Sequence, residues 1–218
     1  MQSLTNEEKE RFCELLACLL SPPDQEMIEQ VHQGNLRSFL EHYVQSWGGE
    51  TGLLNGFLME GDPENLFGDL EREYRRLFSD VGSDPISLIE SFYKPWTQDP
   101  HCPLIFASEK GLLMGDSALH LSALYQQCGL RVADEFTGRP DHIVMELEFL
   151  SYLYRWASDR EVERFMADHL DWVPLLKEEF KKVRPHPFYD SLLELLDLFL
   201  GKERKRLEIE GDGKKNIH

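Results

Sequence analysis

Apolar side chains recur at helical spacing through almost the whole chain, and this periodicity limits the fold more than any other property of the sequence. Residues three or four positions apart share a helix face, so each apolar stripe predicts one helix with a buried side. The first predicted helix starts at a capping box of Thr5 and Glu8 and buries Phe12, Leu16 and Leu19. No segment shows the apolar and polar alternation of a half-buried strand. The sequence therefore predicts an all-α fold, a single multi-helix bundle.

Proline and glycine divide this pattern into two groups of helices. Asp62 and Pro63 are typical of the N-cap and first position of the last N-terminal helix. A segment without periodicity follows; it is rich in proline and still carries Tyr93 and Trp96, which argues against simple disorder. We expect one helical domain over 1–204, composed of N-terminal helices (5–78), an aromatic and proline-rich connection (79–103) and C-terminal helices (104–204), followed by a flexible tail (205–218).

The C-terminal half predicts several further helices with identifiable ends. Gly129 is typical of the residue that follows a helix, and Pro140 of the first turn of one. The last predicted helix ends at Leu200, so that Lys202 to Arg206 should be exposed or frayed. The expected helices in this half are Asp116–Cys128, one from Pro140, Asp159–Leu170, one from Pro174 to before Pro185, and Phe188–Leu200.

The charge balance excludes some partners. The chain has 23 Lys and Arg against 40 Asp and Glu, a net charge of -17, which would repel a nucleic-acid backbone or an anionic membrane and attract basic peptides. The acidity is equally explained by solubility. Cysteines at 13, 18, 102 and 128 form no CxxC pair and are expected to be reduced. With an acidic start and no apolar run of membrane-spanning length, we expect a cytoplasmic protein.

The segment around Pro140 is the strongest indication of function. Asp141 and His142 follow this proline at the predicted mouth of an amphipathic helix. A carboxylate favours the positive end of a helix, and histidine changes charge near neutral pH, so the pair suits a cationic or hydrogen-bonding partner at the rim. The simpler interpretation is a helix cap beside a surface histidine.

Catalytic motifs are missing from the sequence. It contains no glycine-rich phosphate loop, nucleophile elbow, paired metal-ligand motif or suitable Cys/His couple, so we expect no enzyme activity, no cofactor and no metal. His142 and Glu146 share a helix face, as do Asp116 and His120, but each pair lacks further ligands. We interpret both as hydrogen-bonded surface pairs, which leaves a metal-dependent hydrolase as the weakest alternative.

Three segments carry a resemblance to a known family. The chain resembles the TorD/DmsD/NarJ family of cytoplasmic assembly chaperones for molybdenum-containing oxidoreductases, over roughly Leu66 to Leu200. The third segment, in which Pro-Asp-His precedes Glu-Leu-x-Phe-Leu, is the most specific. The segments are Pro85 to Tyr93 with Trp96, Gly111 to Asp116 leading to Tyr125 and Gly129-Leu130, and Arg139 to His142 with Glu146 to Leu150.

The resemblance implies a non-enzymatic helical chaperone. It would bind the twin-arginine signal peptide, or another segment, of an apo catalytic subunit and hold that subunit back from export until its cofactor is inserted. Site residues carried over from the family are Pro140, Asp141, His142, Tyr93 and Trp96. The family's tryptophan-rich loop is reduced here, because Trp96 is the only tryptophan between Asp80 and Pro103.

Side-chain chemistry is compatible with that role. Carboxylates bind arginine through paired hydrogen bonds, and Glu90, Asp141 and Glu146 are candidates for this end of a groove. The candidates for its apolar wall are Phe92, Tyr93, Trp96 and Leu112, although Tyr93 is equally expected in the core and Glu90 as a helix-cap partner. A helical adaptor that binds folded partners remains the alternative function. The oxidoreductase served, the oligomeric state and nucleotide binding are left open.

Overall fold

The structure, a computed structural model, describes residues 4–59, 61–79 and 85–215, with the backbone alone from residue 209 onward. Within these residues the only β pairing is an isolated antiparallel bridge between Ile89 and His142, so the predicted all-α fold class is confirmed. In chain order the helices are α1 (Asn6–Leu19), α2 (Gln25–His32), α3 (Asn35–Ser46), the 3-10 helix η1 (Thr51–Phe57), α4 (Pro63–Phe78), η2 (Glu90–Phe92), α5 (Asp116–Gln127), η3 (Asp134–Phe136), α6 (Ile143–Trp156), α7 (Asp159–His169), α8 (Val173–Val183) and α9 (Pro187–Lys215).

The predicted helix starts are confirmed where a side chain caps the backbone. Thr5 and Glu8 form the capping box of α1, with the Glu8 amide 3.2 Å from the Thr5 hydroxyl. Asp62 caps α4 and Pro63 occupies its first turn. Gly129 follows α5 with a φ of +72°, a left-handed conformation that favours glycine. Local signals therefore located these helix ends.

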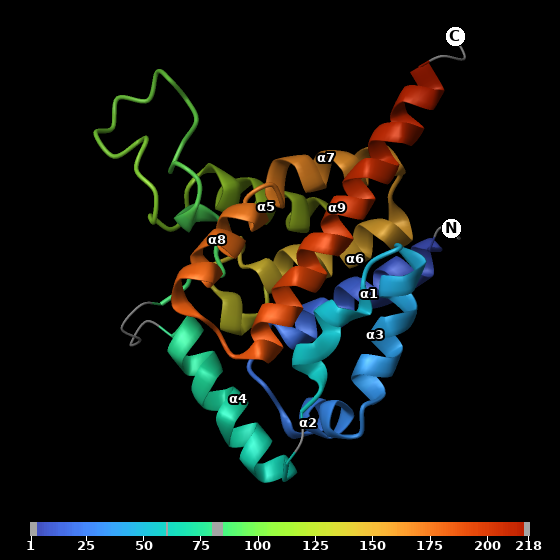
Figure 1. The fold of residues 1–218 in the computed structure, drawn as a ribbon. Coiled ribbons are helices and arrows are strands. Elements are labelled where there is room, and N and C mark those ends of the chain that lie inside the picture. Colours follow the sequence, from blue (N-terminus) through green and yellow to red (C-terminus); the bar gives the residue numbers. More distant parts are fainter. Residues whose placement is uncertain (1–3, 60, 80–84, 216–218) are drawn as a thin grey trace.

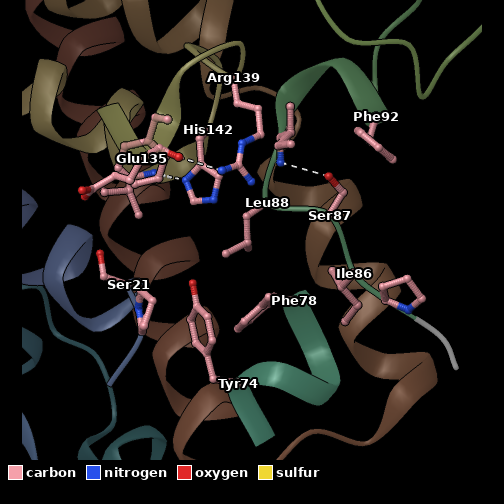
Figure 2. A pocket seen from close by; sticks show the side chains of 15 residues that line it. Ser21, Tyr74, Phe78, Ile86, Ser87, Leu88, Phe92, Glu135, Arg139 and His142 are labelled. Carbon is pink, nitrogen blue, oxygen red and sulfur yellow. Dashed lines mark hydrogen bonds between the residues drawn. The ribbon is translucent and has the colours of Figure 1, made fainter. Parts of the chain in front are cut away.

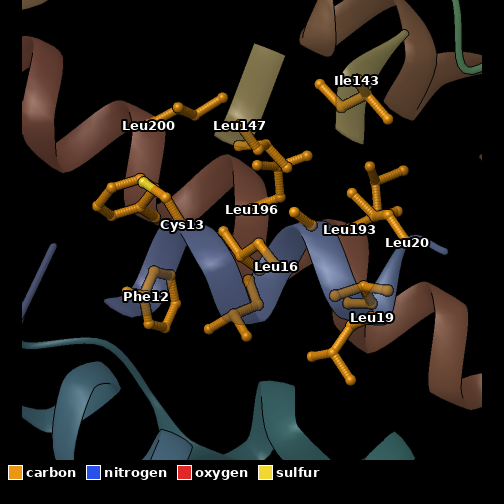
Figure 3. Packing of buried hydrophobic residues seen from close by; sticks show 14 of the residues in the cluster. Phe12, Cys13, Leu16, Leu19, Leu20, Ile143, Leu147, Leu193, Leu196 and Leu200 are labelled. Carbon is orange, nitrogen blue, oxygen red and sulfur yellow. The ribbon is translucent and has the colours of Figure 1, made fainter. Parts of the chain in front are cut away.

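Helix α1 lies at the centre of the bundle, against α6 and α9 (Figure 1). Its apolar face, with Phe12 and Leu16, meets Leu147 of α6 and Leu196 and Leu200 of α9 (Figure 3). The Phe12 ring also packs against Tyr43, Trp47 and Phe199, at centroid distances of 4.9, 4.9 and 5.0 Å. One continuous core thus joins the N-terminal and C-terminal groups of helices.

The expected exposure of Lys202 to Arg206 is wrong. Helix α9 continues to Lys215, and within it Glu203 and Leu207 are buried, each with 3% of its surface exposed. The Lys9 ammonium of α1, itself 2% exposed, lies 3.1 Å from the Glu203 carboxylate, so a buried ion pair anchors this part of α9. Residues 216–218 of the expected tail lie outside the described residues.

The connection between α3 and α4 contains η1, which packs against α9. A Cβ added to Gly56 would lie 1.9 Å from the carbonyl oxygen of Pro187, so only glycine allows this approach. The division into a domain over 1–204 and a tail stays a prediction.

The aromatic connection contains η2 but no α-helix in its described residues, and the irregular chain continues as far as Gly115. Residues 80–84 of this predicted segment lie outside the described residues. Cysteines 13, 18, 102 and 128 are all free thiols. No described helix combines the length and apolar character needed to cross a membrane.

Candidate functional site

The structure brings four of the predicted site residues together at the start of α6. Residues 88–90 run antiparallel to this start: the Glu90 amide donates to the carbonyl of Asp141 at 2.9 Å, and the Ile143 amide donates to the carbonyl of Leu88 at 2.8 Å. Asp141 lies in a turn and His142 has an extended backbone, with φ -78° and ψ 138°, so α6 begins at Ile143 and not at Pro140. Pro140 is buried just before the helix, and its carbonyl accepts a 3.0 Å bond from the Tyr125 hydroxyl.

The expected position of Asp141 at the rim is wrong. Its side chain is fully buried, and its Oδ2 accepts hydrogen bonds from both the backbone amide, at 2.9 Å, and the hydroxyl of Ser91. Burial raises the pKa of Asp141, although the bonds from Ser91 oppose this shift. Asp141 therefore fastens η2 to the start of α6 and presents no carboxylate to solvent.

Glu146 is also fully buried, one turn further along α6. Its Oε2 accepts a 3.1 Å bond from the indole N–H of Trp172, while its Oε1 has no hydrogen-bond partner among the described residues. Burial, together with the nearby carboxylate of Glu90, raises the pKa of Glu146 well above its ordinary value. Its surroundings therefore favour the protonated, neutral form of Glu146 more than water does.

Glu90 is the charged member of this buried carboxylate cluster, which we define as Glu90, Asp141 and Glu146. The ammonium of Lys94 lies 2.6 Å from its Oε1, and Nδ1 of His169 lies 3.0 Å from its Oε2. Burial would raise the pKa of Glu90, but the bonds from His169 and Lys94 lower it below its ordinary value. Glu90 therefore links η2 to α7 through its buried contact with His169.

A cavity of about 530 Å³ adjoins this cluster, a volume typical of ligand pockets. We call it the α4–α6 cavity (Figure 2). Tyr74 and Phe78 of α4 form one wall, and His142 and Arg139 lie across from them. The full lining is Ser21, Pro22, Tyr74, Phe78, Pro85, Ile86, Ser87, Leu88, Ile89, Phe92, Glu135, Phe136, Arg139, His142 and Val144.

His142 is the predicted site residue that reaches this cavity. It is the N-cap of α6, and its Nδ1 accepts a 3.3 Å bond from the Val144 amide. Burial lowers the pKa of His142 to about 3, so its imidazole is neutral near pH 7. Its role is therefore hydrogen bonding and packing, in contrast to the charge-changing role expected from the sequence.

Two of the predicted aromatic residues, Tyr93 and Trp96, lie outside the cavity. Tyr93 stacks on Trp172, with ring centroids 5.0 Å apart, and its hydroxyl donates to the carbonyl of Ser87 at 2.9 Å. Trp96 packs edge-on against Phe106 at 5.1 Å. Phe92, which was also predicted for the apolar wall, does line this cavity, together with the aromatic residues of α4, and a peptide-binding role of Trp96 stays a prediction.

Sequence reasoning missed the α4 contribution, since Tyr74 and Phe78 fit the apolar stripe of a core helix. It also missed Arg139 and Glu135, although both stand in the polar segment that precedes Pro140. Arg139 donates to the carbonyl of Glu135 at 2.7 Å, and Glu135 is the one carboxylate among the lining residues. The useful signal was this pair of opposite charges beside the predicted helix start.

The two residue pairs considered for metal binding have other partners. Asp116 Oδ2 accepts bonds from the Thr97 hydroxyl at 2.7 Å and the Gln98 amide at 3.0 Å. His120 Nδ1 lies 2.8 Å from Nε2 of His169. Among the residues that the structure describes, no three His, Cys, Asp or Glu side chains gather as metal ligands would.

The wild-type protein is expected to lose stability as pH rises, because of Glu146, and the Glu146→Gln variant is expected not to show this loss. A carboxyl group with a raised folded-state pKa stabilises the fold fully below its unfolded pKa of about 4.3, and this contribution is lost as pH rises through the folded pKa. Above pH 4.3 the wild type should therefore weaken relative to the variant, by at most about 1.4 kcal/mol per pH unit. Urea unfolding of both proteins at acidic and alkaline pH measures the difference.

The exposed Glu163 of α7 provides the matched control, because Glu163→Gln makes the same substitution at a carboxyl group on the surface. The free energy of unfolding of this control should match that of the wild type at both pH values. An equal difference between wild type and Glu146→Gln at both pH values would show that Glu146 does not carry the pH dependence.

Comparisons with known proteins agree on one family. The sequence profile described as nitrate reductase delta subunit matches residues 45–185. Two curated relatives, both named chaperone protein TorD and both from Vibrio vulnificus, strains YJ016 and CMCP6, are 25% identical over 107 residues, which is 44% of this chain and 50% of each relative. This chain thus spans about half the length of the curated relatives that it matches.

A solved structure supports the fold over nearly the whole chain. The crystal structure of a protein from Archaeoglobus fulgidus, proposed in its description to act in redox enzyme maturation, has a TM-score of 0.50 and 21% sequence identity. The superposition covers 95% of this chain and 96% of the other. At this identity the likeness concerns the fold.

Proposed function

Because this chain belongs to the nitrate reductase delta subunit family, we propose that it is a maturation chaperone whose α4–α6 cavity holds an apolar segment of an oxidoreductase subunit before assembly. The signal peptide, or another unfolded segment of an apo catalytic subunit of a molybdenum-containing oxidoreductase, is the ligand we assign to it. The relatives named chaperone protein TorD support the chaperone part of this proposal.

The observation that carries the proposal is the α4–α6 cavity itself. Its walls combine aromatic and aliphatic side chains with polar groups on one side, at Glu135, Arg139 and His142. An apolar peptide segment is bound by such walls, and convergent polar groups fix its orientation. The family resemblance implies a binding role for the Pro-Asp-His segment, and His142 of this segment lines the cavity.

The predicted carboxylates act indirectly in this proposal. Asp141, Glu146 and Glu90 are buried, so they position η2 and the start of α6 and thereby shape the cavity wall. Glu135 is exposed at the cavity, and it is the carboxylate that we assign to a basic residue of the ligand. The net charge of -17 favours the approach of such a basic segment.

Ser87→Trp tests the proposal by filling the cavity. Ser87 is a half-buried lining residue, so an indole at this position should occupy the ligand's space and leave the bundle folded. The probe is a fluorescent synthetic peptide with an arginine pair followed by an apolar stretch. We expect affinity to fall at least about tenfold, or about 1.4 kcal/mol, measured by fluorescence anisotropy.

Ser38→Trp on the exposed surface of α3 is the matched control and should bind the peptide as the wild type does. Helical circular dichroism checks that both variants are folded. If Ser87→Trp and the wild type bound the peptide with equal affinity, the cavity would not be the peptide-binding site. A wild-type protein that captures only folded complexes from its native host, and not the peptide, would support an adaptor instead.

A further inference from the structure

Residues 97–115 form a long irregular loop that stands away from the helices (Figure 1). We call this loop the arm. Its base is built from backbone hydrogen bonds: the Trp96 amide donates to the carbonyl of Glu109 at 2.8 Å, and the Asp116 amide donates to the carbonyl of Trp96 at 2.8 Å. Asp116 also accepts a 2.7 Å bond from the hydroxyl of Thr97. The arm is therefore an ordered element with a defined base.

The arm presents aliphatic side chains to solvent. Ile105 is 96% exposed and Leu104 43% exposed, and on the returning side Leu113 and Met114 are 45% and 39% exposed. Met114 has a φ of +59°, a left-handed conformation that is unfavourable for a side chain of this size. Solvent-facing aliphatic residues on a strained, ordered loop are typical of a contact surface.

The tip of the arm also lacks charge. Residues 100–108 include no Asp, Glu, Lys or Arg, in a chain where such residues make up 29%. Ionic attraction therefore does not select the partner of the tip, and the tip is suited to apolar side chains. Incompletely folded polypeptides offer such side chains before their own cores close.

Phe92 connects the arm to the α4–α6 cavity. Its ring lines the cavity and is 43% exposed. On the arm side, a Cβ added to Gly111 would lie 4.0 Å from this ring, and the Gly111 amide donates to the carbonyl of Ser91 at 3.0 Å. A polypeptide that leaves the cavity past Phe92 therefore reaches the arm at Gly111, on its returning side.

We propose that the tip of the arm, at Leu104 and Ile105, binds a second apolar segment of the same incompletely folded polypeptide that occupies the α4–α6 cavity. This inference rests on the function proposed above and adds a second contact surface to it. The arm then covers apolar side chains of this polypeptide, so that they do not contact other proteins while the cavity holds the first segment.

Site-specific photo-crosslinking in the native host tests this contact. The photoreactive residue p-benzoylphenylalanine is introduced in separate proteins at Phe136, where it replaces an aromatic ring of the cavity wall, and at Ile105, in the arm. Trp156 serves as the matched control, because it is 68% exposed at the far end of α6 from His142. We expect cross-links from Phe136 and Ile105 to two different segments of one oxidoreductase subunit, with a yield from Ile105 at least fivefold above that from Trp156.

The outcomes separate this inference from the proposed function. Cross-links from Phe136 but none above control from Ile105 would overturn the role of the arm alone. A product that joins Ile105 to a second copy of this chain, or to its own cavity, would overturn it as well. If neither Phe136 nor Ile105 cross-links to an oxidoreductase subunit, the proposed function fails together with the inference.

Discussion

Replacing Glu203 with alanine is expected to lower the free energy of unfolding by about 3 to 5 kcal/mol. The Glu203 carboxylate lies 3.1 Å from the Lys9 ammonium, and it also accepts bonds from the Tyr154 hydroxyl at 3.1 Å and from Arg206 at 3.0 Å. Its removal leaves a buried ammonium group without the carboxylate that faces it. Chemical unfolding followed by circular dichroism measures the loss.

The double variant Lys9→Met/Glu203→Leu is the control for this interpretation. It removes both buried charges, so it should be less destabilised than Glu203→Ala, because no unpaired charge remains in the core. The exposed pair of Arg11 and Glu7, 2.6 Å apart, provides a surface comparison, and Glu7→Ala should cost less than about 1 kcal/mol. If Glu203→Ala unfolded like Glu7→Ala, this part of α9 would not be anchored as the structure shows.

The substitution Asp141→Ala is expected to cost about 2 to 4 kcal/mol of stability, because it leaves the buried amide and hydroxyl of Ser91 without their acceptor. It should also weaken binding of the arginine-containing peptide, because η2 and residues 88–90 form part of the cavity wall. Asp141→Asn keeps one acceptor oxygen and should lose less stability. Urea unfolding and fluorescence anisotropy measure the two effects.

A double-mutant cycle with Ser91→Ala identifies the contact responsible. The two substitutions together should cost less than the sum of the single ones, with a coupling of about 1 to 2 kcal/mol. Peptide binding lost in Asp141→Ala without any change in unfolding would mean that Asp141 contacts the ligand itself. That result would restore the surface role expected from the sequence and contradict its buried position.

Local sequence signals predicted most of the helices. Capping by Thr5 and Asp62 and termination by Gly129 depend on side chains and backbone within a few residues, so a single sequence is sufficient to locate them. The end of α9 was misplaced because Lys202 to Arg206 appear polar in isolation. Glu203 is buried only because Lys9 and Tyr154 of distant helices pack against it.

The candidate site was located by sequence but not resolved into its parts. The Pro-Asp-His segment indicated a region that adjoins the α4–α6 cavity, and His142 lines this cavity. Asp141 was expected at a rim because the sequence places it before a helix, whereas its partner Ser91 is 50 positions away in the chain. The sequence contains both residues but carries no local signal of their contact.

The sequence by itself determined that the chain is helical, where most helices begin, and which short segment adjoins the candidate site, because helix periodicity and capping are interactions between near neighbours. Only the tertiary structure decided which carboxylates are buried, which aromatic side chains line the cavity, and where the apolar arm lies relative to it. The environment of a charge depends on groups that folding brings from distant positions, as His169 approaches Glu90 across 79 positions of the chain.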